Sequence, residues 1–151
     1  MDSWKSYQLS LDHLSLARDK QAMISKLELE NNLLRINAKY DYIQLSANNM
    51  TISRNIAAIQ SLTVSRNDSL INAIDVALKV LHDDLNRDPV LFLSSGNMML
   101  DSILSFIDAY KIKLVIPIHT YLQASNMQSL LKLKGLQYFN IQQNLFRICN
   151  L

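Results

Sequence analysis

The chain has 151 residues, 49 % of them hydrophobic, and a formal net charge of +2. This length suits one domain, or one small domain with an extension, and the apolar content excludes a wholly disordered chain. A charge this small does not by itself indicate a nucleic-acid or membrane partner.

Cysteine content and hydropathy bear on the compartment. The chain has one cysteine, Cys149, which excludes an intrachain disulfide and fits a reducing compartment. The N-terminal residues lack the apolar run of a secretory signal, and no stretch approaches the ~20 apolar residues of a membrane span. The longest apolar run, Ile112–Ile118, is interrupted by Lys113 and Pro117. We therefore expect an intracellular protein, cytoplasmic or nuclear, without membrane contact.

Helix-breaking residues are confined to the second half of the chain. Residues 1–88 contain no glycine and no proline, and the first of either is Pro89. A long segment without breakers, rich in Leu, Ile and Ala, predicts helix with few interruptions. Because proline disfavours helix at the residue before it, we expect a boundary at Asn86–Pro89. This gives a helical, coiled-coil-like arm over 1–88 and a small domain over 89–151.

A seven-residue repeat runs through this arm. One row of residues is spaced by seven and a second row follows it by four, which is the 3–4 alternation of a coiled-coil seam. The first row is Ala22, Leu29, Ile36, Ile43 and Met50, and the second is Leu33, Tyr40 and Ala47. From these rows we predict an interface made by Leu29, Leu33, Ile36, Tyr40, Ile43 and Met50. The interface contacts a partner protein or a second copy of the chain, unless it packs on the arm's own second helix.

A turn is predicted within the arm. The polar run Thr63–Asp68 supplies helix-capping residues, so one helix is expected to end there and another to follow. The second helix places apolar residues on one face at helical spacing: Leu70, Ile74, Ala77, Leu78, Leu81 and Leu85. We expect the two helices to form a hairpin that buries their apolar faces against each other.

Beyond Pro89 the pattern changes to short apolar runs separated by helical segments. The predicted strands are Val90–Leu93, Ile112–Ile118 and Leu136–Ile141, and the predicted helices are Met98–Tyr110 and Thr120–Leu133. This alternation with short links predicts a small α/β unit with a short parallel sheet. The expected fold class is therefore α+β, a long helical hairpin or coiled coil followed by this unit.

Groups able to drive a reaction are sparse. Ligands of parallel α/β units meet the strand ends, here Ser94–Asn97 and Pro117–Thr120. The first has one glycine and no partner lysine, which falls short of a phosphate-binding fingerprint. His119 lies where a general base would act, but the nearest acids in sequence, Asp101 and Asp108, lie inside the preceding helix. We predict a protein that is not an enzyme, with no catalytic residue, cofactor, metal site or small-molecule substrate.

Basic residues are concentrated in the C-terminal part. Residues 89–151 hold five Lys and Arg against two Asp and Glu, whereas residues 1–88 hold ten against eleven. The five are Lys111, Lys113, Lys132, Lys134 and Arg147. They are predicted nucleic-acid contacts, with Tyr138, Phe139 and Phe146 nearby to stack on bases. The other interpretation is solvated lysine around a small core that contains the aromatic residues.

The segment from Val90 to about Leu133 resembles the opening of a PIN domain of the type found in nonsense-mediated decay factors. Val90–Leu93 matches the first strand of that family, Asn97 its asparagine and Leu114–Pro117 its second strand. The metal-binding acids of the family are replaced by Ser95, Gln123 and Ser125. Neutral side chains do not neutralise divalent ions as carboxylates do, so the resemblance implies an inactive scaffold.

Two functions lead, and an enzyme built around His119 is the third hypothesis. The first is a non-enzymatic interaction or assembly protein that oligomerises or binds a partner through the N-terminal coiled-coil stripe. The alternative is an RNA-binding module with an inactive PIN-like C-terminal half.

Overall fold

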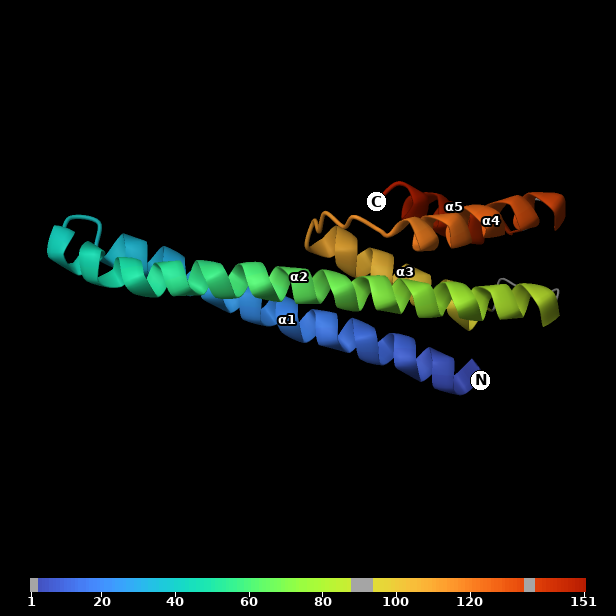
Figure 1. Cartoon of the computed structure of the whole chain (residues 1–151), viewed down its shortest axis with the longest axis horizontal. Coiled ribbons are helices and arrows are strands. Elements are labelled where there is room, and N and C mark those ends of the chain that lie inside the picture. Colours follow the sequence, from blue (N-terminus) through green and yellow to red (C-terminus); the bar gives the residue numbers. More distant parts are fainter. Residues whose placement is uncertain (1–2, 88–93, 135–137) are drawn as a thin grey trace. The chain divides into compact units, whose positions relative to one another are not determined.

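A computed structural model of the chain describes residues 3–87, 94–134 and 138–151 (Figure 1). Within these ranges the chain forms helices and no strand. The helices are α1 (Ser3–Asn37), α2 (Tyr42–Arg87), α3 (Ser95–Ala109), α4 (Ile118–Lys134) and α5 (Phe139–Cys149). The expected α+β fold with a parallel sheet is therefore wrong.

The apolar runs that were predicted to be strands form other structures in the described part of the chain. Residues 112–117 connect α3 to α4 without a strand partner. This connection buries Ile112 and Leu114 and leaves Val115 exposed, so its alternating pattern comes from a linker that packs every second side chain on the core. In the third run, Ile141 lies in the first turn of α5. The predicted strand Val90–Leu93 lies outside the described residues.

The chain divides into two compact units. Met1–Leu14 and Leu70–Leu151 form the first, here called the bundle unit, and Ser15–Ser69 form the second, here called the hairpin unit. Helices α1 and α2 each contribute a segment to both units.

The bundle unit has an apolar core. Its largest fully buried side chains come from all five helices: Leu14, Leu70, Ile74, Leu78, Leu81, Leu100, Ile103, Leu104, Met127, Leu131 and Ile141. Helix α5 packs against both α3 and α4. The predicted face of the second helix is confirmed, since the residues expected there are all buried.

Gly96 allows α3 to begin close to α2. A Cβ atom at this position would lie 2.6 Å from the Leu81 nitrogen and 2.8 Å from the Ala77 oxygen, distances that backbone atoms do not tolerate. The neighbouring Ser94 caps α3, because its hydroxyl oxygen accepts from Asn97 N at 3.4 Å and its hydroxyl donates to Asp84 Oδ2 at 2.5 Å. The glycine and hydroxyl read from the sequence as a turn at a strand end therefore serve helix packing and capping.

The hairpin unit consists of two antiparallel helical segments joined at residues 38–41 (Figure 1). In this turn Lys39 N donates to Ile36 O at 3.3 Å and Asp41 N to Ala38 O at 3.1 Å. Asp41 then caps α2, because its Oδ1 accepts from Gln44 N at 3.0 Å. A carboxylate at this position satisfies an otherwise unpaired N–H and suits the positive end of the helix dipole.

The turn predicted at Thr63–Asp68 is wrong, since α2 continues through it. The polar side chains there bond within the helix or to its neighbour instead of capping an end. Thr63 Oγ1 donates to Ile59 O at 2.7 Å, and Arg66 Nε donates to Asn67 Oδ1 at 3.1 Å. Residues typical of caps are compatible with a helix interior when their side chains find such partners.

Candidate interaction surface

The residues predicted as an interface are exposed. We call the two rows found in the sequence the outer row: Ala22, Leu29, Leu33, Ile36, Tyr40, Ile43, Ala47 and Met50. The six large side chains of this row are between 48 % (Leu33) and 88 % (Tyr40) exposed. Within the hairpin unit the outer row is therefore not a core, and the alternative in which it packs on the second helix is not realised.

A different seven-spaced row makes the hairpin contact. This inner row consists of Ala17, Ile24, Asn31, Ala38, Leu45, Ile52, Ile59 and Arg66. None of its members is exposed, and Ala17 and Ala38 are completely buried. Members of the outer row such as Ile36 and Ile43 lie two positions before members of the inner row, or about 200° round the helix. Each helix of the hairpin thus has a buried face and, opposite to it, an exposed apolar face.

Polar side chains occupy much of the hairpin interface. Asn55 Nδ2 donates to Asn31 Oδ1 at 2.8 Å and to Glu30 Oε1 at 3.1 Å, and Asn31 Nδ2 donates to Ile52 O at 3.3 Å. Among the described residues, every buried side-chain nitrogen and oxygen has a hydrogen-bond partner. Because an unpaired amide is costly to bury, these pairs fix the register of α1 on α2.

A second polar contact lies further along the hairpin. Arg66 Nη1 donates to Gln21 Oε1 at 2.5 Å, and both residues are buried. Burial lowers the pKa of Arg66, and the charge of Glu28 acts in the opposite direction. Arginine remains cationic at neutral pH in such a setting, so the hairpin interface contains a charge.

The predicted nucleic-acid contacts do not form one patch. Lys111 and Lys113 precede α4, whereas Lys132 and Lys134 lie in its last turn. Helix α4 has 17 residues, so its length of about 25 Å separates the two pairs. Arg147 is engaged in an ion pair with Asp108, and Lys134 Nζ donates to Leu85 O at 3.2 Å.

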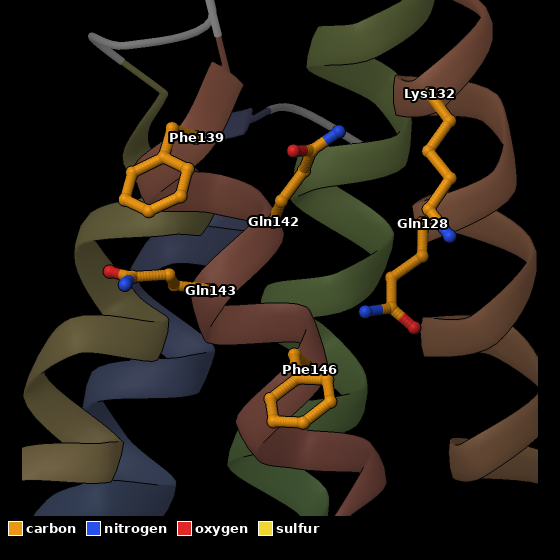
Figure 2. Close-up of a pocket in the computed structure, with 6 residues that line it drawn as sticks. All are labelled: Gln128, Lys132, Phe139, Gln142, Gln143 and Phe146. Carbon is orange, nitrogen blue, oxygen red and sulfur yellow. The ribbon is translucent and has the colours of Figure 1, made fainter. Parts of the chain in front are cut away.

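A shallow pocket of about 260 Å³ lies between α4 and α5 (Figure 2). Phe139, Gln142, Gln143 and Phe146 project from α5, and Gln128 and Lys132 project from α4. Two of the predicted stacking aromatics, Phe139 and Phe146, are exposed beside one of the predicted lysines, whereas the third, Tyr138, is buried. The structure therefore brings together part of this predicted site.

His119 has an acidic partner that the sequence did not indicate. Its Nε2 lies 3.2 Å from Asp75 Oδ2, and Thr120 Oγ1 donates to Asp75 Oδ1 at 2.7 Å. Asp75 comes from α2, 44 positions before His119, so proximity in sequence pointed to the wrong acids. These two side-chain contacts of Asp75 join the first turn of α4 to α2.

Two further observations concern possible metal ligands and the cysteine. No group of three or more His, Cys, Asp and Glu side chains there is placed to hold a metal ion. The Cys149 thiol donates to Gln128 Oε1 at 3.6 Å, and burial raises its pKa. A raised pKa lowers the thiolate fraction at neutral pH, so this cysteine is a poor nucleophile.

The chain matches no protein-family model, no curated protein and no solved structure. The resemblance to PIN domains stays a prediction. Of the helices that the structure describes, none combines the length and apolarity needed to cross a bilayer.

Proposed function

We propose that this chain is a non-enzymatic assembly protein that associates with a second copy of itself through the outer row. The observation that carries the proposal is the exposure of Leu29, Ile36 and Ile43 at coiled-coil spacing. Large apolar side chains repeated along an exposed helix face mark a site that another helix can cover. Leu29, Leu33 and Ile36 are spaced by four and then three residues, and Ile43, Ala47 and Met50 have the same spacing. The apolar row of one copy can therefore pack against the apolar row of another.

The expected affinity is moderate. Fully burying a Leu or Ile side chain contributes about 1.5–3 kcal/mol. In the single chain about half or more of the area of each large outer-row side chain is still exposed, so only that part can be buried on association. Burying the remainder on two copies yields roughly 10 kcal/mol at ~1 kcal/mol for each large side chain. Association itself costs about 4–15 kcal/mol, so the net gain is at most about 6 kcal/mol and self-association is expected only above roughly tens of micromolar.

A double substitution tests the proposal. Ile36→Asp with Ile43→Asp places two carboxylates in the outer row, and we expect the sedimentation mass to fall below that of the unsubstituted chain. The control is Val115→Asp, at a β-branched residue of the bundle unit that is at least as exposed as the two isoleucines, and it should leave the mass unchanged. Helical content by circular dichroism should be the same in all three proteins.

An unaltered mass in the double variant would reject the outer row as an interface. Loss of helical content would also reject it, because the row would then contribute to the fold of the single chain. The alternative function is measured in parallel by RNA titration at two salt concentrations, since phosphate contacts make affinity fall steeply with salt.

A further inference from the structure

The inner row keeps its spacing of seven through the turn between α1 and α2. Asn31, Ala38 and Leu45 are successive members of the row, and they lie before, in and after the turn. The outer row also continues in step, from Ile36 to Ile43. Two helices joined by a turn need share no common register, whereas a single continuous helix requires one.

The turn has no residue that opposes a helix. Its four residues are Ala38, Lys39, Tyr40 and Asp41, without glycine or proline, and none has a positive φ. Alanine and lysine are good helix formers, and tyrosine and aspartate are tolerated. Tyr40 is 88 % exposed and Ala38 is completely buried, so straightening this segment loses little buried area when the partner chain covers Ala38 again.

The hairpin contacts of α1 are with α2, so an identical α2 from another chain can supply them. In the hairpin unit the Asn31–Asn55 and Gln21–Arg66 pairs join the two helices. In the bundle unit Ser10 Oγ donates to Ala73 O at 3.1 Å. Exchange of an identical element preserves every such contact and is a low-cost route to a dimer, particularly when the hinge is short.

We infer that residues 38–41 are a hinge, and that two chains exchange α1 by opening there into one continuous helix. The open helix spans Ser3–Arg87, and the two copies lie antiparallel with their inner rows in contact. Opening also places Leu29, Ile36, Ile43 and Met50 on one face, joining the two halves of the outer row into one four-heptad ridge. This exchange does not depend on the outer row being an interface, since the inner row holds the two copies together.

A pair of engineered cysteines distinguishes the closed and exchanged forms. In a Cys149→Ser background, Asn31→Cys and Asn55→Cys are introduced together, because these two side chains touch across the hairpin. Oxidation over a range of protein concentrations is followed by non-reducing electrophoresis. A closed chain forms the disulfide within itself, whereas an exchanged pair forms it between chains. We expect a covalent dimer whose share of the product rises with protein concentration.

Two controls tie the dimer to exchange at the hinge. Chains with Asn31→Cys alone or Asn55→Cys alone should give no covalent dimer, because in the antiparallel pair each position faces the other one. Lys39→Gly with Tyr40→Gly should reduce the dimer, since each glycine disfavours the continuous helix about two- to threefold relative to the residue that it replaces. Only intrachain disulfide at all concentrations, or a covalent dimer insensitive to the two glycines, would overturn the inference.

The same electrophoresis experiment distinguishes exchange of α1 from association through the outer row. Adding Ile36→Asp and Ile43→Asp should leave the interchain disulfide in place, because these residues lie opposite the inner row. A covalent dimer with no outer-row association supports exchange alone. Outer-row association with only intrachain disulfide supports the proposed function alone.

Discussion

The two units are stabilised by different means. Among the described residues, the bundle unit buries 24 apolar and five polar side chains, whereas the hairpin unit buries four apolar and five polar ones. Two of the four apolar residues in the hairpin unit are alanines, Ala17 and Ala38. Burial of apolar area is the main source of stability, so the bundle unit has a core of its own and the hairpin unit has very little.

The same hydrophobic content is thus placed differently in the two units. The hairpin unit contains many apolar residues, but Leu29, Leu33, Ile36, Ile43 and Met50 are on its surface. Its interior is defined by amide and guanidinium hydrogen bonds, which select one register at little net gain in stability. The hairpin unit would bury more apolar area if a helix of another chain covered its exposed outer row. This supports association as the role of the hairpin unit.

The largest expected effect is in the bundle core. Leu104→Ala empties a completely buried site and should lower the free energy of unfolding by about 2–5 kcal/mol. Leu33→Ala, at an exposed position of the outer row, should change it by less than about 1 kcal/mol at concentrations where the chain is monomeric. Urea unfolding of both variants measures the difference. Equal losses would show that the outer row is covered in the single chain.

The amide contact of the hairpin is expected to give a smaller effect. Asn55→Ala removes the donor to Asn31 and Glu30 and should cost about 1–3 kcal/mol, because buried polar atoms lose their partner. Asn32→Ala, at an exposed neighbouring position, is the matched control and should not lower stability, because alanine has the higher helix propensity. Thermal unfolding followed by circular dichroism measures both. A negligible loss in Asn55→Ala would mean that the hairpin register does not depend on this pair.

The sequence predicted the period of the arm and the outer row, but it did not indicate the inner row that the hairpin buries. Both rows are spaced by seven, and hydrophobicity favoured the outer row because the inner row contains Asn31 and Arg66. An apolar periodicity indicates that one face of a helix is covered, but it does not indicate which element covers it. A buried row that contains polar residues gives a weaker apolar pattern, and it was therefore missed. The position of the turn was missed for a related reason, since Ala38–Asp41 has no breaker and the polar run Thr63–Asp68 imitates one.

The error in fold class has a separate origin. The run from Ile112 to Pro117 alternates as a strand does, but only pairing with another strand makes a sheet, and no single-segment pattern reports a partner. The Asp75–His119 contact escaped prediction because it joins residues 44 positions apart. The face of α2 from Leu70 to Leu85 was predicted correctly, because α2 has a single apolar face there and that face packs into the core of the bundle unit.

The smallest expected effect concerns the polar contacts of Asp75 at the edge of the bundle unit. Thr120 is completely buried, whereas the His119 side chain is 67 % exposed. Solvent screens the second contact, so a double-mutant cycle of Asp75→Ala with His119→Ala should give a coupling of at most a few tenths of a kcal/mol. The cycle of Asp75→Ala with Thr120→Val should give about 1 kcal/mol, the net contribution of a typical hydrogen bond. Urea unfolding of the single and double variants supplies both couplings. A larger coupling to His119 than to Thr120 would show that the ion pair, rather than the buried hydroxyl, joins α4 to α2, and that polar contacts matter as much in the bundle unit as in the hairpin unit.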